Sequence, residues 1–199
     1  MAEDALKSRF LEGVALMNLE RFEPAVTLFR EICDEAERLG NKRLLAIGCN
    51  NLVQVHGYLG DSDQALALAQ ETLKLFQKLD NRVGLAKLQW GVGTLLKTKG
   101  NLPAAVEAFQ AAQDGFSTLQ MRSDVAALHL VLADVHLELG NQSEATRQVL
   151  MAVPIIQAEN MVPEGMAAFA LLQESVRHQK LDRKALRDLH GYFEEVSAS

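Results

Sequence analysis

The sequence predicts an all-α fold, a right-handed α-solenoid of five antiparallel helix pairs, and three series of residues carry this prediction. Each series repeats with a period of 40 residues, which is the signature of a repeat architecture. The series are an alanine, a glycine and a leucine that precedes a polar linker: Ala25, Ala65, Ala105, Ala145 and Ala185; Gly60, Gly100 and Gly140; Leu39, Leu79 and Leu119.

The composition favours helices and excludes several classes of protein. Apolar residues make up 48% of the chain and charged residues 23%, while only 4 prolines are present. The net charge of −6, with scattered Lys and Arg, argues against a nucleic-acid or anionic-membrane surface. No apolar run reaches the ~20 residues that span a bilayer, and the first residues do not resemble a secretory signal. We therefore expect a cytoplasmic protein.

The period divides the chain into five units within one domain, 1–199. Each unit is expected to hold two amphipathic helices joined by a tight turn. The units are 1–40, 41–80, 81–120, 121–160 and 161–199. The first helices are predicted at 5–19, 42–59, 82–99, 122–139 and 162–179, and the second at 22–38, 62–79, 102–119, 142–158 and 182–196.

Turn residues set the expected helix ends. A glycine before each cap supplies the left-handed residue that closes the first helix. Asp61, Asn101 and Asn141 are predicted to cap the second helices, with Pro103 tolerated in a first turn. Pro154 lies inside a predicted helix, where it is expected to kink or end it.

Two units carry a known motif, a small residue followed by large ones and then Ala-x-x-x-Phe. Unit three has Gly93, Leu96, Ala105 and Phe109, and unit one has Gly13, Leu16, Ala25 and Phe29. This pattern resembles the tetratricopeptide repeat family, whose usual period is 34 residues. Variants with the longer period of 40 resemble repeats of bacterial peptide-sensing regulators, maltose-operon-type activators and kinesin light chains. The resemblance implies a binding scaffold with a concave groove.

The sequence predicts no catalytic, cofactor or metal site. His56, His129 and His136 fall at repeat positions where large side chains pack between helices, and no third ligand completes a zinc set. Cys33 and Cys49 lie inside helical patterns, where a thiol acts as a small apolar filler. Glycine loops for nucleotides and nucleophile elbows are absent from the sequence. We therefore expect that the protein is not an enzyme.

The candidate binding surface is the concave face, which the first helices line in such a solenoid. Amides can pair with both edges of a peptide backbone, and tryptophan often anchors interfaces. The central partner-binding residues predicted there are Asn50, Asn51, Gln54, Tyr58, Lys87, Trp90, Thr94 and Lys97. Neighbouring units would add Lys7, Phe10, Val14, Met17, Leu130, Asp134, Glu138, Glu174 and Arg177.

Three functions stay open at this stage. The favoured one is a scaffold that binds a protein or peptide in this groove. The alternatives are a self-associating structural module, such as a homodimer, and a peptide-sensing regulatory module coupled to another domain or protein. A clamp for a C-terminal carboxylate is disfavoured, because only Asn51 and Lys87 match its five positions.

Overall fold

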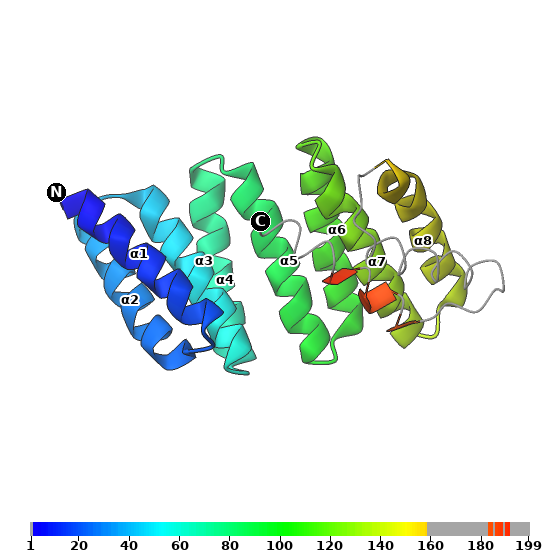
Figure 1. The fold of residues 1–199 in the computed structure, drawn as a ribbon, viewed down its shortest axis with the longest axis horizontal. Coiled ribbons are helices and arrows are strands. Elements are labelled where there is room, and N and C mark those ends of the chain that lie inside the picture. Colours follow the sequence, from blue (N-terminus) through cyan, green and yellow to red (C-terminus); the bar gives the residue numbers. More distant parts are fainter. Residues whose placement is uncertain (1, 159–182, 185, 189, 192–199) are drawn as a thin grey trace. The chain divides into compact units, whose positions relative to one another are not determined.

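The computed structural model describes residues 2–158, 183–184, 186–188 and 190–191. Backbone contacts divide the chain into two compact units, Met1–Lys99 and Gly100–Ser199. In the described ranges every regular element is a helix (Figure 1). The elements are α1 (Ala2–Asn18), α2 (Phe22–Arg38), α3 (Lys42–Tyr58), α4 (Ser62–Lys78), α5 (Arg82–Thr98), α6 (Leu102–Thr118), α7 (Arg122–Glu138) and α8 (Gln142–Gln157).

These eight helices confirm the first four of the five predicted helix pairs. α1 begins earlier than expected, at Ala2 rather than residue 5, and the others agree with the predicted ranges to within one residue. In the first unit each helix packs on the next, from α1 to α5, and α3 also contacts α5. In the second unit α7 packs between α6 and α8. The architecture is an all-α repeat solenoid.

The small residue of the repeat is explained by the packing of α1 on α2. A Cβ atom added at Gly13 would lie 2.8 Å from the Phe29 ring. Phe29 is fully buried, and its ring meets Phe10 edge to face at a centroid distance of 5.8 Å. Gly84 allows the same approach of α5 to Phe76 of α4, at 2.7 Å. Close approach of the helices therefore requires glycine at these two positions.

The described helix-to-helix turns use a left-handed residue. Gly60, Gly100 and Gly140 have φ values of 79°, 77° and 74°, as predicted. Glu20 takes the same conformation at the end of α1, with φ of 56°. Asp80 and Gln120 do so after α4 and α6, with φ of 47° and 59°. The turn geometry is thus more regular than the glycine series indicated.

Two of the three predicted second-helix caps are confirmed. Asp61 Oδ1 accepts from the Gln64 amide at 3.5 Å, and Asn141 Oδ1 accepts from the Glu144 amide at 3.3 Å. The prediction for Asn101 is wrong, because its side chain makes no capping hydrogen bond at the start of α6. Pro103 does lie in the first turn of that helix, where its missing amide hydrogen has no intrahelical acceptor.

Pro154 lies inside α8 without ending it. The helix continues for three residues to Gln157, so of the two expected effects, a kink or an end of the helix, Pro154 does not end it at its own position. Pro154 lies in the last turn of α8. The missing backbone donor removes one intrahelical hydrogen bond there, and few such bonds follow it before the helix ends. The predicted helix 162–179 lies outside the described residues, as does most of the predicted helix 182–196.

Candidate functional site

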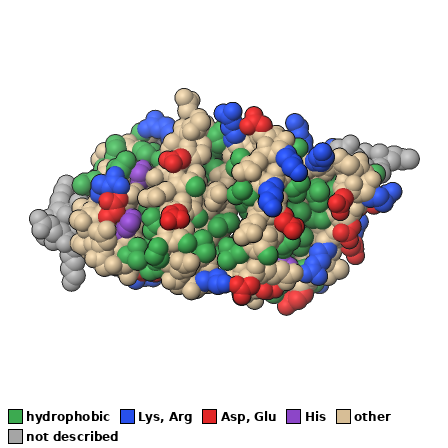
Figure 2. Space-filling model, turned by 180° about the vertical axis from the view of Figure 1, so that it is seen from behind, with side chains coloured by type: hydrophobic (Ala, Val, Ile, Leu, Met, Phe, Trp, Pro, Cys, Tyr) green, Lys and Arg blue, Asp and Glu red, His purple; other side chains and the backbone are tan. Residues whose placement is uncertain are grey.

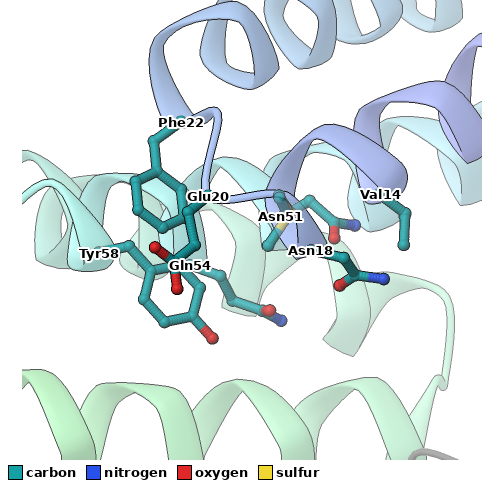
Figure 3. A pocket seen from close by; sticks show the side chains of 8 residues that line it. Val14, Asn18, Glu20, Phe22, Asn51, Gln54 and Tyr58 are labelled. Carbon is teal, nitrogen blue, oxygen red and sulfur yellow. The ribbon is translucent and has the colours of Figure 1, made fainter.

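A cavity of about 430 Å³ opens between α1, α3 and the turn that ends α1 (Figure 3). Three of the predicted partner-binding residues line it, namely Asn51, Gln54 and Tyr58. Val14 and Met17, which were expected on the concave face of unit one, also line it. The remaining lining residues, Asn18, Glu20 and Phe22, were not predicted. The cavity belongs entirely to the first compact unit.

An aromatic stack borders this cavity. The rings of Phe22 and Tyr58 are nearly parallel, at an angle of 17°, with centroids 5.2 Å apart. Tyr58 is nevertheless 64% exposed, so one face of the stack is open to solvent. Figure 3 shows Glu20 together with Tyr58 among the side chains that line the cavity. An exposed aromatic surface next to a charge can hold a cationic or amide group of a ligand.

The three amide side chains of α3 differ in their exposure and in their hydrogen bonds. Gln54 is exposed and lines the cavity. Asn51 is 9% exposed, and its Nδ2 donates to the backbone carbonyl of Ile47 at 2.8 Å. Asn50 is half-buried and lies outside the cavity. The structure therefore separates three amides that the sequence analysis treated as equivalent.

The predicted residues of α5 lie outside this cavity, on the helix that contacts α3. Lys87 and Thr94 are exposed, whereas Trp90 and Lys97 are half-buried. The Thr94 hydroxyl donates to the Trp90 carbonyl oxygen at 3.2 Å, which occupies its donor within the helix. The structure thus brings three of the eight predicted partner-binding residues into one cavity, and the α5 residues form a separate surface.

In the second unit much of the corresponding face of α7 is buried, and the expectation for Leu130 and Asp134 is wrong, whereas Glu138 is exposed. Leu130 is 1% exposed and Asp134 is 5% exposed, so neither is available to a partner. Arg183 Nε donates to Asp134 Oδ1 at 2.8 Å, and Arg183 also pairs with Glu138 at 2.5 Å. These acceptors raise the pKa of Arg183. Arg183 therefore occupies part of the face that was predicted to bind.

The histidines at packing positions are buried as predicted. His56, His129 and His136 are 4%, 5% and 8% exposed, and burial lowers the pKa of each. His129 Nδ1 lies 2.7 Å from Gln148 Oε1. Within the described residues no group of three His, Cys, Asp or Glu side chains is placed to hold a metal ion. The burial of His56, His129 and His136 agrees with the predicted packing positions.

One sequence signal could have revealed part of the cavity. Glu20 stands at the repeat position that carries glycine in the next three units, Gly60, Gly100 and Gly140. A left-handed conformation costs a residue with a side chain roughly 1–2 kcal/mol. A glutamate at a position that otherwise carries glycine therefore departs from the repeat. This departure indicates that its side chain has a role there. No departure from the repeat marked Phe22 as a residue of the cavity.

Membrane-spanning helices and the distribution of charge can both be checked on the described residues. None of the helices in the described ranges is both long enough and apolar enough to cross a bilayer. Figure 2 shows Lys and Arg side chains interspersed with Asp and Glu over the face that it draws. The charge on this face is mixed.

Two family models match the chain, and both describe a tetratricopeptide repeat. One matches residues 44–118 and the other residues 91–155, so together they span 44–155, more than half of the chain. No sequence among the curated proteins matches the chain.

Several solved structures share the fold at low sequence identity. BtubC (BKLC) from P. vanneervenii has a TM-score of 0.75 and 14% identity, covering 99% of this chain and 80% of its own. A Podosopora anserina protein with nearly identical TPR-like repeats has a TM-score of 0.70 and 16% identity, covering 98% of this chain and 95% of its own. A Rap protein complexed with competence and sporulation factor has a TM-score of 0.72 and 12% identity, covering 98% of this chain and 53% of its own.

Proposed function

The chain belongs to the tetratricopeptide repeat family, and from that premise we propose that it binds an extended segment of a partner protein. The cavity bordered by Phe22 and Tyr58 is the proposed site for one side chain of that segment. The observation that carries the proposal is the aromatic stack, which leaves Tyr58 64% exposed beside a cavity of about 430 Å³. An exposed stack of this kind is typical of an interface anchor.

The lining of the cavity favours a basic side chain in the ligand. Glu20 is the only charged residue in the lining, and no Lys or Arg belongs to it. A lysine or arginine of the partner could pair with Glu20 and lie against the Tyr58 ring, combining an ion pair with a cation–π contact. Gln54 would meet the partner's backbone, because its amide both donates and accepts. The same charge argues against an acidic ligand group.

Lys87, Trp90, Thr94 and Lys97 on α5 are proposed to extend the surface along the bound segment. They lie on the helix that packs beside α3, so a segment anchored at Tyr58 can reach them. The two lysines place positive charge there, which suits an acidic residue elsewhere in the ligand. The proposed ligand thus carries a basic anchor and an acidic flank.

A peptide-display selection tests this function. Random peptides are selected on the wild type, and the enriched sequences are then measured by fluorescence anisotropy. We expect enrichment of Arg or Lys at one position and at least a tenfold loss of affinity in Tyr58→Ala, in line with loss of an anchor worth ~2 kcal/mol. Glu20→Gln, which keeps the shape of the side chain, should relax the basic preference.

Thr27→Ala provides the control, because Thr27 is exposed on α2 and is not part of the cavity. It should bind the selected peptides as the wild type does. Circular dichroism confirms that all variants remain folded. Peptides without a basic preference, or equal binding by Tyr58→Ala, would show that the ligand lies elsewhere.

A second candidate function is a sensing module whose curvature responds to the bound segment. The likeness to the Rap protein solved with competence and sporulation factor favours it, although at 12% identity that likeness is one of fold. Small-angle scattering with and without a selected peptide separates the candidates. A change in the radius of gyration supports sensing, and an unchanged profile supports a plain scaffold.

A further inference from the structure

Cys33 and Cys49, the only cysteines of the sequence, lie opposite each other across the interface of α2 and α3. Their Sγ atoms are 3.8 Å apart, and both thiols are free. A disulfide has a sulfur–sulfur distance of about 2.0 Å, so the atoms must close by only about 1.8 Å. A change of the χ1 rotamer of either cysteine moves its sulfur by a distance of this size.

Gly48 makes this close approach possible. A Cβ atom added at Gly48 would lie 2.8 Å from Cys33 Sγ. The Cys33 sulfur therefore occupies the space that a side chain at Gly48 would fill, and Gly48 directly precedes Cys49 in α3. The pair is held in register by packing in the core of the first unit, where Cys33 is 8% exposed.

The pair is also reachable from solvent. Both cysteines line an open hollow of about 430 Å³ between α2, α3 and α4. Cys49 is half-buried, whereas Cys33 is buried, so a small oxidant meets Cys49 first. The hydrogen bond between the two sulfurs lowers the pKa of Cys49 and raises the pKa of Cys33. A thiolate at Cys49 is the nucleophile that reacts with a peroxide.

We propose that Cys33 and Cys49 form a modification site that a peroxide converts reversibly into a disulfide joining α2 to α3. This inference is independent of the proposed ligand site, because neither cysteine lines that cavity. It goes beyond the expectation that both thiols act only as apolar fillers.

The reaction has two balanced steps. The Cys49 thiolate attacks one oxygen of hydrogen peroxide, the O–O bond breaks, and the released hydroxide takes a proton, which gives a sulfenic acid and water. The Cys33 sulfur then attacks the Cys49 sulfur, the S–O bond breaks, and the departing hydroxide takes the Cys33 proton as a second water. Two thiols are oxidised, one peroxide is reduced, and a dithiol reductant reverses the change.

The bond would connect the second helix of repeat one to the first helix of repeat two. It therefore restrains the motion of α3, the helix that carries Gln54 and Tyr58, relative to α2. A cross-link also reduces the freedom of the unfolded chain between residues 33 and 49. The oxidised protein should accordingly unfold at a higher temperature than the reduced protein.

The test uses the full chain, reduced and then freed of reductant. The protein is treated with equimolar hydrogen peroxide, alkylated under denaturing conditions and examined by intact mass and peptide mapping. We expect neither cysteine to be alkylated, a peptide that joins the two, a mass lower by two hydrogen atoms, and full reversal by dithiothreitol. Peptide mapping separates this product from methionine oxidation.

Two variants test the order of the steps. In Cys33→Ala the sulfenic acid at Cys49 has no resolving thiol, so dimedone should trap it, while the wild type gives little adduct. In Cys49→Ala the buried Cys33 should react with peroxide at least tenfold more slowly than Cys49 does in Cys33→Ala. Circular dichroism checks the fold of both variants.

Three outcomes would overturn the proposal. They are alkylation of both cysteines after peroxide treatment, stable oxygen adducts on the wild-type cysteines, and disulfide formation only between molecules. Each can be read on the wild type alone, so the result does not depend on whether the variants fold.

Discussion

The first helices of repeats two and four occupy the same place in their helix pairs but differ in what covers them. On α3, Gln54 is exposed and Tyr58 is 64% exposed. On α7 the residue equivalent to Gln54 is Asp134, which is 5% exposed and paired with Arg183. A run of consecutive residues from Ala126 to His136 is buried. The chain therefore leaves this face of α3 open, whereas Arg183 covers part of the equivalent face of α7.

This difference shows that a repeat position does not by itself define an exposed position. The repeat fixes which residues point to the inside of a helix pair, because those contacts recur in every unit. Exposure of the remaining face depends on contacts that do not recur. The four predictions that follow test the difference between α3 and α7, from the largest expected effect to the smallest.

The largest effect is expected from truncating equivalent residues on the two helices. Leu130→Ala removes a side chain that is 1% exposed and should lower the free energy of unfolding by about 2–5 kcal/mol. Asn50→Ala, at the equivalent position of α3, should change it by about 0.5 kcal/mol or less. Urea unfolding followed by circular dichroism measures both. Equal effects would show that the two faces are equally buried.

The ion pair over α7 provides the second test. Arg183→Ala removes the donor to a carboxylate whose side chain is 6% exposed. Because Arg183 itself is 43% exposed, we expect a loss of about 1–3 kcal/mol rather than the full cost of a buried pair. Arg187→Ala is the control, since Arg187 is exposed on the same segment. If both variants unfold alike, the Arg183 contacts contribute little to closing the face.

Buried histidines should make α7 more sensitive to acid than α3. Burial lowers the pKa of His129 and His136 on α7 below the value of about 6.5 in the unfolded chain. Below that pH the unfolded state binds protons that the folded state does not bind. Stability should therefore fall as the pH drops from about 7 to 5, by up to about 1.4 kcal/mol per pH unit for each histidine.

His136→Leu isolates this effect. In the described part of the chain neither ring nitrogen of His136 makes a hydrogen bond, so an apolar replacement loses no such bond. The variant should show a shallower loss of stability toward pH 5. His56→Leu on α3 should change the slope less, because the Asp61 carboxylate lies 3.5 Å from the His56 ring and offsets the burial more directly than Glu144 does for His136. A steeper slope in either variant would contradict the assigned pKa directions.

The smallest effect concerns the starts of helices in the two units. Asn41 Oδ1 accepts from the Leu44 amide at 3.1 Å at the start of α3, whereas Asn101 makes no such bond at the start of α6. Asn41→Ala should therefore cost about 1 kcal/mol, and Asn101→Ala a few tenths. Thermal unfolding of both variants compares them. A larger loss in Asn101→Ala would reverse the assignment of the caps.

The helices and turns were predictable because their determinants are local and repeated. Glycine at Gly60, Gly100 and Gly140, with the alanine series, fixes where the first helix of a pair ends and the second begins. The closed face of α7 was not predictable, since Asp134 and Arg183 are 49 positions apart and belong to no repeating series. Part of the cavity lining was predictable. The repeat pattern placed Gln54 and Tyr58 on the concave face, whereas Phe22, at the start of α2, lies beside them only because its ring stacks on Tyr58.

The equal dimensions of the units have a consequence for how such a chain can grow. Seven of the eight described helices have 17 residues, and α8 has 16. An in-frame duplication of one unit in the gene would therefore add two helices that pack against their neighbours through the same contact surfaces as the existing units. A deletion would remove two in the same way. A single duplication or deletion would then add or remove an exposed helix face, and no new contact surface between helices would have to evolve.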